Sequence, residues 1–186
     1  MFHGKKKGDE QKLLWQLEKI KFPWTQRGLL WGNWLEYVKP APPESRNKWT
    51  TDWDKYRSRS YQGLVLKTVD YHSGRKRQVP NKYRPLYNAL MTYIAARVPD
   101  YSVDGIQLNK NLVCKPHVDR RNTHRSYVLF LGDFEGGELF FEDGSVVCEK
   151  NMLHGIDGQV KHWNGPITRG TKYSIVWYQL ALRGSP

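Results

Sequence analysis

Residues 126–149 read SYVLFLGDFEGGELFFEDGSVVCE and decide the fold of this chain. Runs of apolar and aromatic residues are interrupted here by Gly136-Gly137 and Asp143-Gly144, a pattern typical of short strands joined by tight turns. Similar runs lie on both sides, so that strands are predicted at 105–108, 126–131, 137–142, 145–149, 159–163 and 171–181. Many short strands at regular spacing indicate a β-sandwich or barrel.

The chain before these strands predicts helices. Asp9 is expected to cap a helix whose apolar residues recur at helical spacing: Leu13, Leu14, Leu17 and Ile20. Pro85 can open a second helix with a stripe of residues four apart: Leu86, Leu90, Ile94 and Val98. Leu64-Val65-Leu66 and Val69 suggest a strand between them. We therefore expect the α+β class, as a double-stranded β-helix (jelly roll) with N-terminal helices packed on one sheet.

The length of 186 residues suits a single domain. We expect a helical, basic and tryptophan-rich part over 1–100 and a metal-binding jelly-roll core over 101–186. No run of 18 apolar residues exists, which excludes a transmembrane helix, and the N-terminus lacks the apolar core of a secretory signal. Two cysteines favour a reducing, intracellular compartment, with a nuclear or virus-encoded setting left open, and we expect a monomer.

The positive charge is concentrated in the first part of the chain. The formal net charge is +12, and 20 of the 30 Lys and Arg residues precede residue 101. Residues 46–84 interleave cations with Trp and Tyr, and Arg75, Lys76 and Arg77 occupy the tip of a predicted turn. Cations among flat rings suit a phosphate backbone with stacked or flipped bases, and we expect these three to bind phosphate. The alternative is a solvated basic face whose rings belong to the core.

Candidate metal ligands come from two separate stretches. His117 and Asp119 stand two apart in a strand-like segment, where both side chains can face one metal ion. His162 is the preferred third ligand over His154, because Lys172 follows His162 by ten positions whereas the corresponding position after His154 is Asn164. Two imidazoles and one carboxylate on one face of an octahedral ion leave three positions open, as in non-haem Fe(II) oxygenases.

A cation and a hydroxyl follow the third candidate ligand. Lys172 and Ser174 share a face by strand alternation and suit the far carboxylate of a dicarboxylic co-substrate. The order of these residue types along the chain is far more specific than any one of them alone.

Residues 105–181 resemble the Fe(II)/2-oxoglutarate-dependent oxygenase superfamily, and most closely its Tet and J-binding-protein nucleobase hydroxylases. The stretches that carry this resemblance are 108–111 (LNKN), 115–122 (KPHVDRRN), 131–139 (LGDFEGGEL) and 162–178. The resemblance implies Fe(II), 2-oxoglutarate and O2 as cofactors. It implies His117, Asp119 and His162 as iron ligands, and Lys172 and Ser174 as partners of the 2-oxoglutarate C5 carboxylate.

Two departures from the family pattern concern the co-substrate. Many relatives have Arg where Lys172 stands, and Lys offers a point charge in place of a bidentate fork. Leu112 stands where some nucleobase hydroxylases have an Arg for the other end of 2-oxoglutarate, so Asn109, Asn111 and Tyr127 are the candidates for that contact.

The resemblance also suggests a substrate. Asn122 lies three residues after the metal-binding Asp, where some relatives contact the target base, and Arg120 and Arg121 contact either phosphate or solvent. We expect hydroxylation of the 5-methyl group of a pyrimidine, thymine or 5-methylcytosine, in DNA, with the base flipped out or single-stranded. The alternatives are a prolyl-type protein hydroxylase and a non-catalytic basic jelly-roll module that binds nucleic acid.

Overall fold

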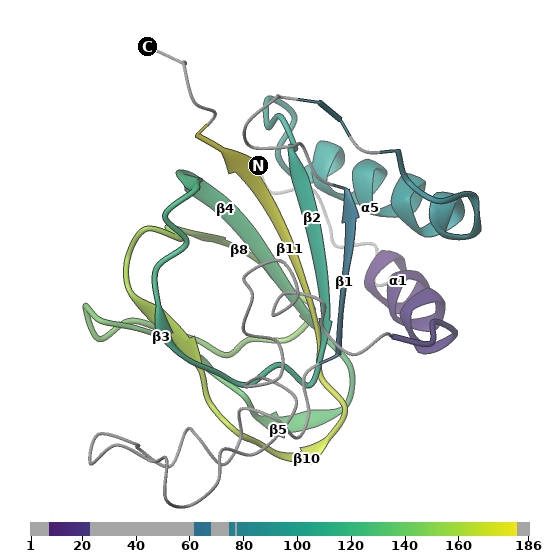
Figure 1. The fold of residues 1–186 in the computed structure, drawn as a ribbon. Helices are drawn as coiled ribbons and strands as arrows, with labels where there is room; N and C mark the ends of the chain where they lie inside the picture. Colours follow the sequence, from purple (N-terminus) through teal and green to yellow (C-terminus); the bar gives the residue numbers. More distant parts are fainter. Residues whose placement is uncertain (1–7, 23–61, 68–74, 77, 182–186) are drawn as a thin grey trace, which may run out of the picture.

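The computed structural model describes residues 8–22, 62–67, 75–76 and 78–181 (Figure 1). It contains two α-helices, α1 (Asp9–Glu18) and α5 (Arg84–Arg97), and a 3-10 turn, η2 (Asn81–Tyr83). The strands in chain order are β1 (Gln62–Lys67), β2 (Gly105–Lys110), β3 (Cys114–His117), β4 (Asn122–Leu131), β5 (Phe134–Gly136), β6 (Leu139–Phe141), β7 (Val146–Val147), β8 (Leu153–Ile156), β9 (His162–Asn164), β10 (Ile167–Gly170) and β11 (Tyr173–Leu180). The tryptophan-rich stretch 23–61 and most of the predicted 71–77 turn lie outside the described residues.

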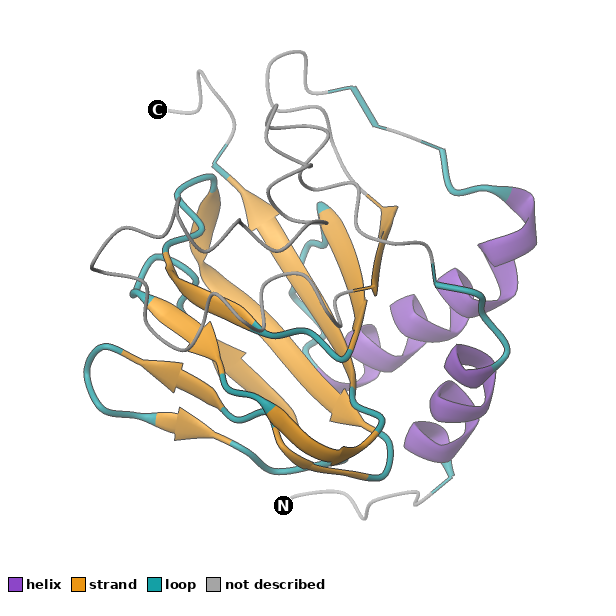
Figure 2. Ribbon diagram, turned by 60° about the horizontal axis from the view of Figure 1, so that its bottom comes forward, coloured by secondary structure: helices purple, strands orange, loops and turns teal. Residues whose placement is uncertain are grey.

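Two sheets face each other, and the helices cover only one of them. The larger sheet has the order β1-β2-β11-β4-β8, the smaller has the order β3-β9-β6-β7, and β10 pairs with β5. Every recorded strand pair is antiparallel. Both helices lie on one side of the five-stranded sheet, with the smaller sheet on the other side (Figures 1 and 2). The prediction of helices followed by a series of strands on a mainly β architecture is confirmed.

The two helices form where the apolar spacing predicted them. Leu13 and Leu17 are the buried residues of α1, and α5 begins at Arg84 with Pro85 in its first turn, where the missing N–H costs no hydrogen bond. Gly8, and not Asp9, is the N-cap of α1. Asp9 lies instead in the first turn, where its carboxylate faces the positive end of the helix dipole and Arg97 of α5 at 3.7 Å.

The central strand β11 separates two apolar clusters by simple alternation. Tyr173, Ile175 and Trp177 point toward the helices and join the larger cluster, together with the buried residues of α1 and α5. The opposite face of the same sheet packs through Val128 and Phe130 of β4 against the smaller sheet. That inner face also carries buried polar side chains, and it is the face on which the candidate site is built.

All six strands predicted after residue 100 are present in shortened or extended form, but four further strands were missed. They are β3, β5, β8 and β10. These segments are three or four residues long, and the sequences CKPH, FEG, LHGI and ITRG carry no clear alternation. Their extended form is set by pairing with neighbouring strands, which a local pattern does not encode.

Candidate metal centre and co-substrate site

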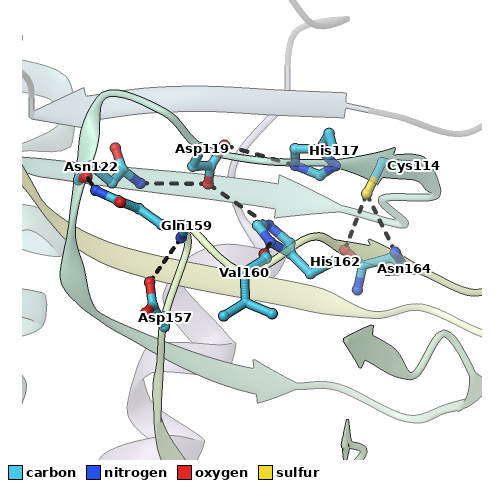
Figure 3. Close-up of polar contacts among 9 residues, drawn as sticks. All are labelled: Cys114, His117, Asp119, Asn122, Asp157, Gln159, Val160, His162 and Asn164. Atoms are coloured by element: carbon cyan, nitrogen blue, oxygen red, sulfur yellow. Dashed lines mark hydrogen bonds and ion pairs between the residues drawn. The ribbon is translucent and has the colours of Figure 1, made fainter. Parts of the chain in front are cut away.

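Strand pairing between β3 and β9 brings the three candidate ligands together. His117 is the register partner of His162, so their imidazoles lie side by side with ring centroids 4.4 Å apart. Asp119 Oδ1 lies 3.7 Å from His117 Nε2, and Asp119 Oδ2 lies 3.8 Å from His162 Nε2 (Figure 3). One potential ligand atom from each residue lies within 4.8 Å of the others.

Asp119 reaches this cluster in a different way from the one predicted. β3 ends at His117, so Asp119 lies beyond the strand and alternation does not place it. Its backbone N–H donates to Gly158 O at 2.8 Å, which anchors the turn after β3 to the turn before β9. His117 and Asp119 do face the same point, as predicted, but a hydrogen bond between two turns, and not strand alternation, positions Asp119.

The orientation of His162 suits a metal ligand. Its Nδ1 lies 2.7 Å from Val160 O, and since a carbonyl can only accept, Nδ1 carries the proton. Nε2 is then the atom with the free lone pair, and it is the atom that faces Asp119. A backbone carbonyl that fixes the tautomer in this way is the usual partner of a metal-bound histidine.

The donor set fits a single Fe(II) ion. Metal bonds to nitrogen and oxygen of about 2.1 Å let one ion bridge ligand atoms separated by up to about 4.2 Å. The two His–Asp separations fall below that limit, and all three ligand atoms lie within 4.8 Å of one another. The His162 side chain is 7% exposed, whereas those of His117 and Asp119 are 31% and 23% exposed. The cluster is thus anchored on one side and open on the other. His154, the rival third ligand, lies on β8 with its Nε2 at 3.6 Å from Glu149 and does not join it.

Lys172 and Ser174 lie on the inner face of the five-stranded sheet and are both buried, with exposures of 2% and 5%. The Lys172 ammonium donates to Gly137 O and lies 3.7 Å from the centroid of the Phe130 ring. No carboxylate of the described chain lies within ion-pair range of it. Burial therefore lowers the pKa of Lys172 from its ordinary value of 10.5 to about 7, and the charges of Cys114 and Glu138 only partly oppose this shift.

The candidates for the other end of 2-oxoglutarate do not lie where they were expected. Asn109 donates through Nδ2 to Ser174 Oγ at 3.2 Å, so it belongs to the Lys172–Ser174 end. Tyr127 is a correction, because it points to the opposite face of the sheet, where it packs against the helix-side cluster and edge-on to Tyr101. Asn111 accepts from the backbone N–H of Lys172 at 2.9 Å and has a positive φ of 52°, which makes it a turn residue.

The candidate substrate residues cluster only in part. Arg120 and Arg121 are exposed in the turn directly after Asp119. Asn122 donates through Nδ2 to Asp119 Oδ2 at 3.4 Å, so its amide lies against a candidate metal ligand. Arg75 and Lys76 are exposed, and Arg77 lies outside the described residues.

Three polar residues of the site were not found from sequence. Gln159 donates through Nε2 to Asn122 O at 2.7 Å, and Asn164 bonds to Cys114 between β9 and β3 through its backbone N–H and its Oδ1 (Figure 3). Gln107 donates to Asn109 at 2.9 Å. Asn164 and His162 share one face of β9, and Gln107 and Asn109 share one face of β2. The two-residue spacing of Asn164 from His162, and of Gln107 from Asn109, could have indicated a shared strand face. The spacing alone did not show which face of each strand turns toward the site.

Several solved structures have a fold similar to that of this chain. An oxidoreductase of the 2OG-Fe(II) oxygenase family from Burkholderia pseudomallei matches with a TM-score of 0.52 and 15% identity, over 95% of this chain and 92% of that one. NgTET1 in complex with 5mC DNA matches with a TM-score of 0.46 and 16% identity, over 70% of this chain and 64% of that one. A prolyl-4-hydroxylase from Pseudomonas putida matches with a TM-score of 0.44 and 17% identity, over 91% and 87%.

No protein-family model and no curated protein matches the sequence. The fold is nevertheless similar to that of a solved 2OG-Fe(II) oxygenase family protein, in agreement with the superfamily resemblance seen in the sequence. The His-Asp-His cluster supplies a ligand set of the kind that such an enzyme needs for iron. None of the described helices has the length and apolar character needed to cross a lipid bilayer.

Proposed function

We propose that this protein is an Fe(II)- and 2-oxoglutarate-dependent dioxygenase. The observation that carries the proposal is the His117, Asp119 and His162 cluster, together with a buried Lys172 that has no described carboxylate partner. His117, Asp119 and His162 would hold the iron, and Lys172 and Ser174 would hold the distal carboxylate of 2-oxoglutarate. When bound, these groups and O2 supply oxidative decarboxylation to succinate and CO2, coupled to hydroxylation of a C–H bond.

The protein's own residues supply geometry and a low-dielectric environment. Val160 O fixes the proton of His162 on Nδ1, and the Gly158 carbonyl holds the backbone of Asp119. Burial makes Lys172 expensive to charge without an anion, so a carboxylate that binds there gains the attraction that water would otherwise weaken. The two facing sheets with helices on one side support the double-stranded β-helix as the architecture that holds these groups.

For the substrate, we propose the 5-methyl group of thymine or 5-methylcytosine in DNA. The net charge of +12 favours a polyanion, and Arg120 and Arg121 are exposed and directly follow Asp119 in the sequence. A stacked base does not reach a metal held between two sheets, so the base would be flipped out or single-stranded. Arg75, Lys76 and Arg77 would contribute further phosphate contacts. The two cysteines are free, in keeping with a reducing intracellular setting.

The test is anaerobic reconstitution with Fe(II) and 2-oxoglutarate, followed by O2 and one of three additions: methylated DNA, a proline-containing peptide, or buffer. We expect DNA-dependent succinate and a nucleoside heavier by about 16 Da, the mass of one oxygen atom. The His162→Ala variant should lose both signals, and Glu135→Gln, an exposed carboxylate paired with Arg169, should keep them. Hydroxylation of the peptide and not of the DNA would show that the substrate is a protein. The absence of succinate under every condition would contradict the proposal that this protein is a dioxygenase.

A further inference from the structure

A chain of three polar side chains runs along the inner face of the five-stranded sheet and ends at Ser174. Gln107 and Asn109 stand two apart on β2, and Asn109 is the register partner of Ser174 on β11. Gln107 Nε2 donates to Asn109 Oδ1 at 2.9 Å, and Asn109 Nδ2 donates to Ser174 Oγ at 3.2 Å. Asn109 is 2% exposed, so little water is at hand to replace these bonds.

The direction of this chain is fixed at its far end by a backbone carbonyl. Gln107 Nε2 also donates to Leu108 O at 3.3 Å, and a carbonyl oxygen can only accept. Gln107 must therefore turn its NH2 group to this side, so Asn109 must present its oxygen to Gln107 and its NH2 group to Ser174. Reversing either amide would set donor against donor or acceptor against acceptor.

The consequence falls on the Ser174 hydroxyl. One lone pair of Oγ receives the Asn109 amide, so the O–H is directed elsewhere, and no described residue accepts it. The Lys172 ammonium lies on the same face, over the ring of Phe130, which is the register partner of Ser174 on β4. Two buried donors, Lys172 and Ser174, thus share one face, and among the described residues Lys172 donates only to the neutral carbonyl of Gly137 and has no carboxylate partner. Buried donors of this kind favour an external acceptor.

We propose that Gln107 and Asn109 are positioning residues that hold Ser174 as a hydrogen-bond donor and thereby select an ionised carboxylate at the far end of the co-substrate. This inference rests on the proposed 2-oxoglutarate dependence. An ionised carboxylate accepts from both Ser174 and Lys172. A neutral amide at the same place offers one accepting atom and one donating group, so its NH2 group would face either the Ser174 proton or the Lys172 ammonium.

The test compares two ligands that differ only at this end: 2-oxoglutarate and its C5 monoamide. Each is titrated calorimetrically into Mn(II)-loaded full-length protein, without turnover. The Gln107→Met variant keeps the length of the side chain and removes the NH2 group that orients Asn109. We expect its affinity for 2-oxoglutarate to fall about tenfold and its affinity for the monoamide to change less than about twofold. The Gln11→Met variant, on the exposed face of α1, should bind both ligands like wild type.

A double-mutant cycle separates positioning from a general structural effect. If Gln107 acts through Ser174, then Gln107→Met added to Ser174→Ala should change neither affinity further. Gln107→Glu, which keeps the shape and loses the NH2 group, is the second variant and should show the same loss of selectivity. Equal losses for both ligands, or the same loss in the Ser174→Ala background, would overturn the relay. Wild-type protein that binds neither ligand would overturn the proposed function itself.

Discussion

At the residue scale, Lys172 has a buried ammonium group and no carboxylate partner among the described residues. Such a group destabilises the ligand-free protein, because the charged side chain loses its hydration on burial and no negative charge fully replaces it. A site that binds an anion gains from this arrangement, since the ligand supplies the missing charge. Lys172 therefore links the stability of the fold to the occupancy of the site.

The buried ammonium predicts a pH dependence with a defined sign. Between pH values of about 7 and 10.5 the unfolded chain keeps the Lys172 proton that the folded chain has lost. The unfolded state then binds more protons, so stability rises with pH in this window by about 1.4 kcal/mol per unit, and below pH 7 this contribution is flat. The difference in unfolding free energy between wild type and Lys172→Met, measured by urea unfolding at a series of pH values, gives the contribution of Lys172.

We expect Lys172→Met to be more stable than wild type below pH 7, with a difference that shrinks toward pH 10. The apolar side chain has a similar length and carries no charge to bury. A difference that stays constant across the range would show that Lys172 does not titrate in this window.

The ligand cluster makes a prediction that needs no turnover. Mn(II) at 100 times its dissociation constant should stabilise wild type by about 2.7 kcal/mol, because it binds only the folded state. Asp119→Asn weakens the one anionic ligand and should remove most of this gain, whereas Glu135→Gln should keep it. Thermal unfolding with Mn(II), and again with a chelator, measures the effect. An unchanged gain in Asp119→Asn would exclude that carboxylate from the metal site.

At the scale of elements, strand pairing positions two of the candidate ligands, His117 on β3 and His162 on β9, whereas Asp119 lies in the turn after β3. That turn lies against the turn that leads into β9. The two turns are joined by Asp119 N–H to Gly158 O and by Gln159 Nε2 to Asn122 O. A strand would fix Asp119 by its own alternation, whereas here its position depends on the hydrogen bonds between the two turns.

Gln159→Ala tests this dependence. Losing one hydrogen bond should cost about 1 kcal/mol of stability, and loosening the Asp119 turn should weaken Mn(II) binding by about tenfold. Gln11→Ala, on the exposed side of α1, is the matched control and should change neither quantity. Loss of stability without loss of metal affinity would mean that the turn-to-turn bond does not hold Asp119.

The end of β10 depends on a glycine for a steric reason. Gly170 has a φ of +77°, and a Cβ there would overlap the backbone carbonyl of Asp133, which cannot swing aside. Gly144 has a similar φ of +86° but nothing within 4 Å of the added carbon. Gly144→Ala should therefore cost about 1 kcal/mol and Gly170→Ala clearly more, as measured by urea unfolding. Equal costs would show that the contact relaxes freely.

At the scale of the whole molecule, the five-stranded sheet separates two functions. Its helix side is apolar and stabilises the fold, while its inner side carries the buried polar residues of the candidate site. α1 lies on the helix side of this sheet, whereas β3, which carries His117, lies on its other side (Figure 1). Cations on α1 and cations beside Asp119 therefore contribute equally to the net charge. Only the cations beside Asp119 are placed to contact DNA that is bound at the candidate site.

This separation makes the DNA proposal testable by salt dependence. If Arg120 and Arg121 both contact phosphate, Arg120→Gln with Arg121→Gln should reduce the slope of log affinity against log salt by about 1.8. Lys12→Gln with Lys19→Gln removes the same charge from exposed positions on α1 and at its C-cap, and should leave the slope nearly unchanged. The two slopes come from fluorescence anisotropy with a labelled duplex. Equal reductions would mean that only net charge matters.

Residue chemistry and local periodicity account for most of what was predicted correctly. Leu86, Leu90 and Ile94 predicted α5, and the apolar runs after residue 100 predicted six strands. Tyr127 was misplaced because its neighbours Val128 and Leu129 are both apolar and both buried, which hides the phase of the strand. The Asn122 side chain contacts Asp119, which sequence spacing alone did not reveal.

By itself, the sequence determined which elements form and which chemical groups are on offer: two imidazoles, a carboxylate, a lysine and a serine in a recognisable order. Only the tertiary structure decided that His117 lies opposite His162, that Asp119 is held from a turn, and that Gln107 and Asn109 point inward to Ser174. The reason is that periodicity is local to each segment, whereas the face a strand turns to the core depends on its register with distant partners.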